Sequence, residues 1–198
     1  RMSQPIRILH FAAAHIDMIN SGRHDAASGL PQRVLDFLNA LDQIVDRAVD
    51  EAVDLVIFAG DAYRNQRPHP RYQREWQERI MRLSTAGIPT ILLIGNHDTS
   101  PAARQANALQ EFATLRVPNV FVADRFALLT PKQLGVAVQV ITSPWVSHSV
   151  LLTRDTQAQD EQIGQSLEEQ VGRALDALIE RADPDVPLIL TAHAGVAG

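Results

Sequence analysis

The sequence predicts an α/β fold in which helices cover the faces of a parallel or mixed β-sheet. Short apolar runs typical of buried strands alternate with longer segments in which apolar residues recur at helical spacing. This β-α-β-α-β order is the pattern of strands joined by helical crossovers. Residues 119–142 then carry several short β-type runs around a turn sequence. They indicate hairpins, and hence a second, antiparallel part of the fold.

The first strand is expected at Ile6–Phe11, followed by a loop at Asn20–Pro31 that is rich in Gly, Ser, Asp and His. Apolar residues between Val34 and Val49 then predict an amphipathic helix of about four turns. The later elements are expected in this order: strand Leu55–Ala59, helix Arg71–Ala86, a strand starting at Pro89, helix Pro101–Leu115, helix Glu161–Arg181 and strand Pro187–Thr191, the last in the same sheet as the first three strands.

Composition limits the chemistry of any site. With 198 residues, 45% of them hydrophobic and 21% charged, the chain is expected to form one globular domain over residues 1–198. There are no cysteines, so a metal would be held by Asp, Asn and His, a ligand set that suits Mn, Fe or Zn. The net charge of −5 argues against a broadly basic surface for nucleic acid, but not against a local basic strip. No run approaches the roughly 18 apolar residues of a membrane span, so we expect a cytoplasmic protein without a membrane partner.

Metal-competent side chains follow two of the predicted strands. Asp61 comes after the run "DLVIFAG", and Asn96, His97 and Asp98 follow "IPTILLIG". In an open α/β sheet, ligands bind outside the carboxyl ends of the strands. Two metal ions roughly 3.5–4 Å apart can clamp a phosphodiester, and such a pair needs a bridging anion. Asp61 is the natural bridge, whereas the alternative interpretation of "GD" alone is a surface turn.

The pair "GD…GNHD", together with "HFAAAHID" upstream and "LTAHAGVAG" downstream, resembles the calcineurin-like metallophosphoesterases, and within them the SbcD-type DNA-repair nucleases. The resemblance implies a sandwich of mixed β-sheets flanked by helices. It also implies two divalent ions, most commonly Mn²⁺, with Fe, Zn or Mg as other options. It assigns His15 to the first metal, Asn96 and His193 to the second, and Asp61 to both. Without the resemblance, we would interpret His193 as a partly buried polar residue that follows an apolar strand.

The resemblance assigns His97 to catalysis, as the group that contacts the phosphate and protonates the leaving oxygen. An imidazole with a pKa near ~6.5 suits a general acid. Asp98 is expected either to accept a hydrogen bond from the His97 ring or to form a turn or N-cap before Pro101.

Substrate contacts are expected from arginines beside these motifs. Arg64 and Arg67 begin a basic strip after Asp61, and such a strip binds DNA phosphates or is a solvated helix face. Arg23 and His24, in the loop after the first strand, are further candidates. The remaining members of the strip are Arg71, Arg74, Arg79 and Arg82.

One position departs from the family pattern. The family opens with Asp-x-His, and here the matching residues are Ala13, Ala14 and His15, so a metal-binding carboxylate is replaced by a methyl group. The family's later Gly-His-x-His motif does not occur, which suggests either a truncated domain or an incomplete family member. We therefore expect a weakened first metal site and low activity.

The resemblance implies DNA as the substrate and an ATPase partner resembling SbcC, and a homodimer is left open. Two alternatives remain. One is a phosphomonoesterase or cyclic-nucleotide phosphodiesterase on the same scaffold, and the other is a non-catalytic scaffold with a degenerate metal site.

Overall fold

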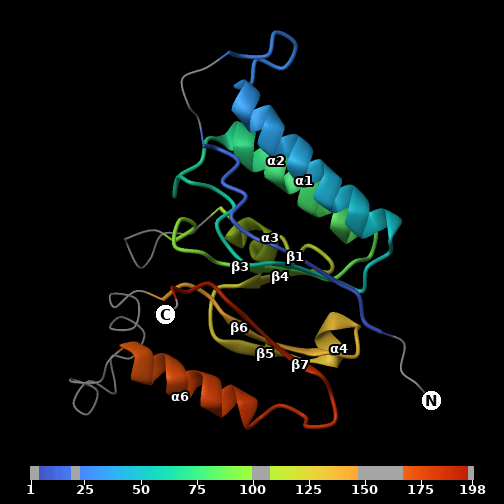
Figure 1. Ribbon diagram of the computed structural model, residues 1–198, viewed down its shortest axis with the longest axis vertical. Helices are drawn as coiled ribbons and strands as arrows, with labels where there is room; N and C mark the ends of the chain where they lie inside the picture. The colour runs from blue at the N-terminus through green and yellow to red at the C-terminus, as the bar shows by residue number, and fades with distance from the viewer. Residues whose placement is uncertain (1–4, 19–22, 100–107, 147–166, 196–198) are drawn as a thin grey trace.

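In the computed structural model, which describes residues 5–18, 23–99, 108–146 and 167–195, two β-sheets lie face to face between helices (Figure 1). The first sheet has the order β1-β2-β3-β4, and every neighbouring pair in it is parallel. The second has the order β5-β6-β7, in which β5 is antiparallel to β6 and β7 is parallel to it. The strands are β1 Ile8–Phe11, β2 Leu55–Phe58, β3 Thr90–Leu93, β4 Val120–Ala123, β5 Ala127–Leu129, β6 Gln139–Ser143 and β7 Leu188–Ala192.

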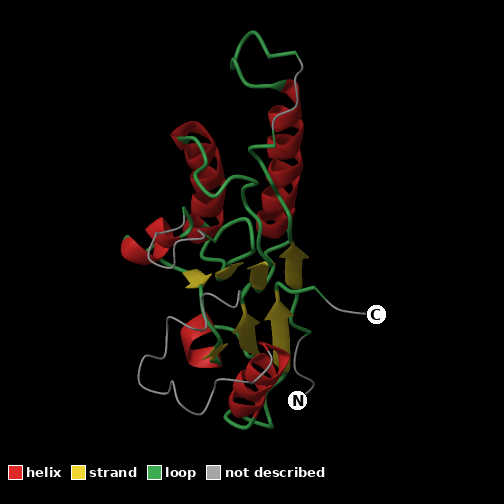
Figure 2. Cartoon of the chain, turned by 90° about the vertical axis from the view of Figure 1, so that its left-hand side faces the viewer, coloured by secondary structure: helices red, strands yellow, loops and turns green. Residues whose placement is uncertain are grey.

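The helices complete a four-layer arrangement. α1 and α2 lie together on the outer side of the first sheet, and α6 lies on the outer side of the second (Figures 1 and 2). The expected α/β sandwich is therefore confirmed. The helices are α1 Gln32–Asp50, α2 Pro70–Thr85, α3 Gln110–Thr114, α4 Pro131–Leu134 and α6 Leu167–Ile179. The start of the helix expected at Pro101 and the start of that expected at Glu161 lie outside the described residues.

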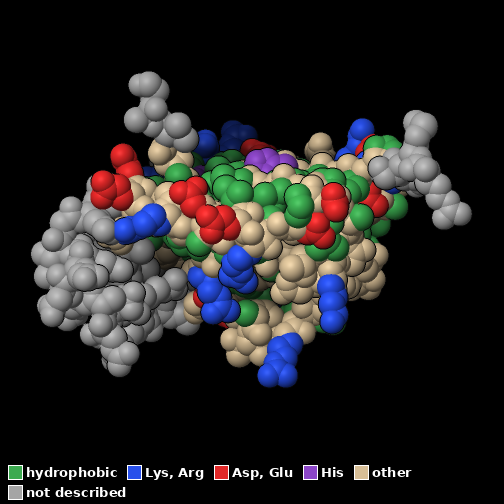
Figure 3. Space-filling view, turned by 90° about the horizontal axis from the view of Figure 1, so that it is seen from below, with side chains coloured by type: hydrophobic (Ala, Val, Ile, Leu, Met, Phe, Trp, Pro, Cys, Tyr) green, Lys and Arg blue, Asp and Glu red, His purple; other side chains and the backbone are tan. Residues whose placement is uncertain are grey.

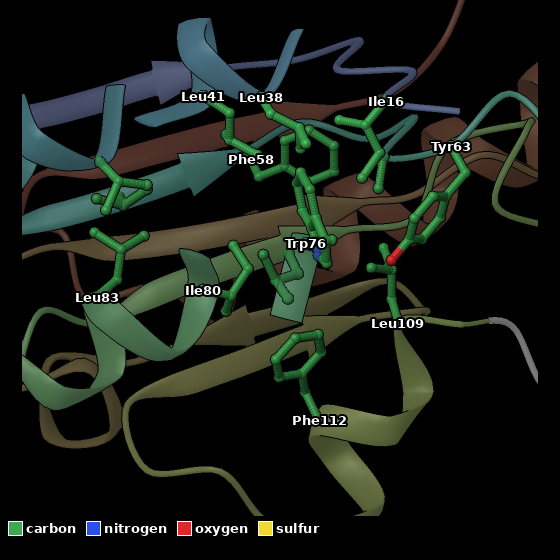
Figure 4. Close-up of a cluster of buried hydrophobic side chains, with 14 of the residues drawn as sticks. Ile16, Leu38, Leu41, Phe58, Tyr63, Trp76, Ile80, Leu83, Leu109 and Phe112 are labelled. Atoms are coloured by element: carbon green, nitrogen blue, oxygen red, sulfur yellow. The ribbon is translucent and has the colours of Figure 1, made fainter. Parts of the chain in front are cut away.

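Alternation along the central strands supplies two hydrophobic cores. In β2, Val56 and Phe58 belong to the cluster shared with α1 and α2, whereas Leu55 and Ile57 belong to the cluster between the sheets. All four are buried, as expected for a strand covered on both faces. Trp76 of α2 is fully buried in the first cluster, with its ring centroid 4.8 Å from that of Phe58 (Figure 4). The two cores fix the strand ends from which the site is built.

Two expectations about the sheets were wrong. The runs from 119 to 142 do not all form hairpins, because β4 joins the first sheet in parallel with β3, and only β5 and β6 are antiparallel. The strand before His193 was expected in the first sheet, but β7 pairs with β6 in the second. The physical reason is that residues 124–126 carry the chain from one sheet to the other. A short apolar run indicates that a strand is buried, but it does not determine which strand it pairs with.

Exposed apolar side chains gather at the α6 and β7 end of the molecule, on the face seen in Figure 3. Ile179, Leu188 and Leu190 are the large ones there. Among the described helices, none has the length and apolar character needed to cross a membrane.

Candidate metal centre

The carboxyl ends of both sheets meet at one edge, where four predicted metal ligands come together. His15, Asp61 and Asn96 follow β1, β2 and β3, and His193 follows β7. Backbone hydrogen bonds join these ends, since His15 N–H donates to the Asp61 carbonyl and His193 N–H to the Ser143 carbonyl. Parallel strands align their carboxyl ends, so residues far apart in sequence are brought together here.

Asp61 is the centre of the cluster. Its Oδ2 atom lies 3.6 Å from Nε2 of His15 and 3.6 Å from Nε2 of His193. Its Oδ1 atom accepts the His97 backbone N–H at 3.0 Å. One carboxylate oxygen is thus fixed by the protein, and the other faces an imidazole on each side. Asp61, with His15 on one side and His193 on the other, would be placed to hold two cations at once.

His193 presents a lone pair to the same point. Its Nδ1 lies 2.7 Å from the Ala59 carbonyl, which can only accept, so Nδ1 carries the proton. In the neutral ring Nε2 is then an acceptor, and it lies 3.0 Å from Asn96 Oδ1, which is another acceptor. Two lone-pair atoms beside the Asp61 carboxylate form a pocket of electron-rich atoms that a cation stabilises. Asp61, Asn96 and His193 therefore fit one divalent ion.

His97 stands beside the other half of the cluster. Its Nδ1 lies 3.0 Å from the Arg64 carbonyl, so this nitrogen also carries the proton. Ligand atoms of His15, Asp61 and His97 all lie within 4.8 Å of one another. The His15 and His97 rings meet edge to face, with centroids 5.0 Å apart. The His97 side chain is thus oriented by a backbone group and lies beside His15 and Asp61.

Asp98 does not orient the His97 ring, so that alternative for its role was wrong. Its carboxylate instead accepts three backbone N–H groups, from Asp61 at 2.8 Å, Ala62 at 3.0 Å and Gly95 at 2.9 Å. Burial raises the pKa of Asp98, and the bonds from Gly95 and Asp61 oppose that rise. Asp98 therefore holds the two ligand-bearing loops against each other.

Two glycines permit this close approach. Gly60 has φ +98°, and a Cβ there would collide with the ring of His193. A Cβ on Gly95 would collide with the Asp61 carboxylate. Gly95 carries no such strain in φ, so its requirement is for space alone, whereas Gly60 needs both space and a backbone conformation that favours glycine.

The first metal position is incomplete among the described residues. Ala13 lies at the matching place, with φ +53°, and its methyl group offers no ligand atom. Asp17, two residues past His15, does not substitute for the missing carboxylate. It is buried and accepts the backbone N–H of Asn65 at 3.1 Å and that of Arg64. This contact was not predicted, because nothing in a lone Asp signals a partner some 47 residues away.

The four predicted substrate-binding residues fall in two places. Arg64 and Arg67 are exposed on the loop after Asp61, and Arg67 lines a surface groove of about 540 Å³. Arg23 and His24 lie in the segment 23–31, which projects beyond the first turn of α1 at one end of the molecule (Figure 1). Within the described part of the chain, no hydrogen bond or ion pair links Arg23 or His24 to the metal cluster. The roles of all four residues in substrate binding stay predictions.

The molecule is thus an α/β protein with a candidate metal centre at the carboxyl ends of its strands. The family model for calcineurin-like phosphoesterases matches residues 6–198, and the chain belongs to this family. The expected resemblance is confirmed. Membership supports hydrolysis of phosphoester bonds with the help of divalent metals.

Among curated proteins, the chain is similar to DNA double-strand break repair protein Mre11 of Halobacterium salinarum, with 39% identity over 43% of this chain and 21% of that protein. It is also similar to the SbcD component of the SbcCD nuclease of Escherichia coli, with 24% identity over 80% of this chain and 40% of that protein. The chain thus spans about a fifth to two fifths of these relatives. Among solved structures, a dimetal phosphatase from Danio rerio has a TM-score of 0.51 at 13% identity, over 97% of this chain and 70% of that one. That likeness concerns the fold alone.

Proposed function

We propose that the protein is a metal-dependent phosphodiesterase that cleaves DNA, as the names of its repair-nuclease relatives suggest. The observation that carries the proposal is the position of Asp61 Oδ2, 3.6 Å from an imidazole nitrogen on either side. A phosphodiester carries one negative charge, and a pair of cations held at this edge would attract it. The relatives named for DNA repair support DNA over other phosphoesters.

The residues present suit one metal position better than the other. Asp61, Asn96 and His193 would hold the second ion, and His15 with Asp61 would hold the first. Mn²⁺ is our choice of metal, because oxygen and imidazole ligands without sulfur suit it. A metal pair held by these residues would supply charge that polarises the phosphate and activates a water for attack.

His97 would act as the general acid. The Arg64 carbonyl holds the proton on Nδ1, which leaves Nε2 as the nitrogen that exchanges a proton with the substrate. Asp98 and Asp17 would not contact the substrate, and they would instead position the loops that carry Asp61 and Arg64. We further propose an ATPase partner resembling SbcC, on the strength of the name of the SbcCD relative.

The test is cleavage of a labelled single-stranded DNA by this chain, with Mn²⁺ and with a chelator. We expect weak cleavage that requires Mn²⁺ and is abolished by Asp61→Asn, a variant of matched shape that lacks the bridging charge. The Ala13→Asp variant should cleave faster than the chain itself. If Ala13→Asp cleaves no DNA but hydrolyses a small phosphate ester, the DNA proposal falls and a phosphomonoesterase replaces it.

A second candidate, a non-catalytic scaffold, is favoured by Ala13 alone. It predicts that Ala13→Asp and the chain itself show equal, background cleavage of every phosphoester. It also predicts that binding to a partner survives a chelator. Cleavage that appears with Ala13→Asp alone would place the loss of activity at this one residue.

A further inference from the structure

Trp145 is an exposed aromatic side chain at the edge of the metal centre. Within the described part of the chain it is the one aromatic among the exposed large hydrophobic residues, with 36% of its surface accessible. Its ring centroid lies 6.2 Å from that of His193, at an interplanar angle of 83°. A single exposed apolar ring is common on protein surfaces, and what distinguishes Trp145 is its position beside the ligand cluster.

The backbone around Trp145 is held from both sheets. Trp145 N–H donates to the Ile94 carbonyl at 2.9 Å, at the end of the strand that leads to Asn96. Two residues earlier, the Ser143 carbonyl accepts the His193 N–H at 2.9 Å. The backbone at Trp145 is therefore anchored to the same two strand ends that carry Asn96 and His193. An anchored backbone holds the ring near the ligand cluster, which lowers the entropic cost of binding a flat partner there.

We propose that Trp145 is a stacking platform for the nucleobase next to the phosphate bound at the metal centre. The inference rests on the proposed function and specifies its substrate as an unstacked, single-stranded nucleotide. A base is joined to its phosphate through one sugar, so a base beside the bound phosphate reaches only the surroundings of the ligand cluster, where Trp145 lies. Aromatic stacking accepts any base, since every base presents a π-face. A base inside a duplex is covered on both sides and cannot use the platform.

Fluorescence tests the contact directly, because the chain has two tryptophans and Trp76 is fully buried. The probe is a single-stranded oligothymidylate with a non-cleavable phosphorothioate backbone, added with Mn²⁺. The comparison probes are an abasic oligomer of equal length and charge, and thymidine monophosphate. We expect the oligothymidylate to quench the exposed tryptophan and the abasic oligomer to leave it unchanged. Thymidine monophosphate that quenches as strongly at equal affinity would identify a mononucleotide as the source of the base, and would overturn the single-strand assignment.

Affinity then measures the contribution of the ring. Trp145→Ala should weaken oligothymidylate binding about 5- to 150-fold, and Trp145→Phe less. Neither substitution should alter binding of the abasic oligomer. Leu190→Ala is the matched control, since Leu190 is also exposed, on the strand before His193. Buried Trp76 reports whether each variant is folded.

The outcomes separate the inference from the proposed function. Equal binding of both oligomers, or an unchanged affinity in Trp145→Ala, overturns the platform and leaves a nuclease that holds only phosphates. If neither oligomer binds, the proposal of a DNA-cleaving enzyme falls, and the platform falls with it.

Discussion

The carboxylate of Asp98 lies against the backbone of Asp61, whose N–H it accepts at 2.8 Å. Asp61 has φ +65°, a left-handed conformation that Asp adopts more readily than most non-glycine residues. The same carboxylate binds Ala62 N–H and Gly95 N–H, so one side chain joins the ends of β2 and β3. The metal-ligand loops are thus held in place by protein contacts before any ion binds.

Asp98→Ala should therefore be strongly destabilising. It leaves three buried N–H groups without an acceptor, and we expect the free energy of unfolding to fall by about 2–4 kcal/mol in urea denaturation. Asp98→Asn is the matched control, because its single oxygen still accepts part of the set, and it should lose less. A change below about 0.5 kcal/mol in Asp98→Ala would show that water replaces the carboxylate.

Arg79 is expected to stabilise the helix pair and to play no part in DNA binding. Its guanidinium is largely buried, and it lies 2.7 Å from Asp42 of α1 and 3.1 Å from Glu75 of its own helix. Arg79→Ala should lower the free energy of unfolding by about 1–2 kcal/mol, between the values for exposed and buried ion pairs. Arg74→Ala, at an exposed site paired along the same helix, should cost no more than about 0.5 kcal/mol.

Arg79→Ala also tests whether the basic strip binds DNA. Arg79→Ala should bind an oligonucleotide as tightly as the unmodified chain, because the guanidinium is already neutralised by carboxylates. A loss of affinity at unchanged stability would restore Arg79 to the DNA-binding surface.

The sequence alone predicted the positions of those site residues that directly follow a single predicted strand. Asp61 and Asn96 each follow a run of buried residues, and that pattern alone places them at the sheet edge. The contact of His193 with Asn96 depends instead on the pairing of β7 with β6, which a five-residue apolar run does not specify. The confirmed fold class therefore came from alternation of elements, and the family from short motifs.

Side chains that accept hydrogen bonds from distant backbone N–H groups were the hardest to predict from the sequence. Besides the nearby Gly95 N–H, Asp98 and Asp17 bind N–H groups of segments 36 or more residues away in sequence. Any Asp can accept such bonds, so residue type gives no signal of the partner. The location of Trp145 beside His193 likewise follows from the way β6 and β7 end together.

Asp25 supplies a prediction about pH. Hydrogen bonds from the Ser28 side chain and backbone lower the pKa of Asp25 from its ordinary value of 3.8. The carboxylate therefore stabilises the loop above that value, and the stabilisation is lost as the pH falls through the lower, folded pKa. An NMR titration of the Asp25 carboxyl carbon should give a midpoint below 3.8. Ser28→Ala should move the midpoint upward, and a midpoint at or above the ordinary value in the unmodified chain would contradict the contact.

Ala13→Asp should strengthen metal binding at the incomplete first position. Asp tolerates a positive φ better than most residues, so the +53° of Ala13 adds no new strain. The new carboxylate would join His15 and Asp61, and its attraction to a cation in this partly buried site exceeds the 1.4 kcal/mol that corresponds to a factor of ten. In a calorimetric Mn²⁺ titration, we expect one ion for the chain as it stands and two for the variant. The affinity of the first metal position should rise at least about tenfold over that of the same, incomplete position in the unmodified chain. Ala13→Asn lacks the charge and Ala12→Asp places it one residue away, so both controls should keep a single ion. An isotherm for Ala13→Asp that matches these controls would mean that the first position needs more than its missing carboxylate, and the non-catalytic scaffold would then be the better account of this chain.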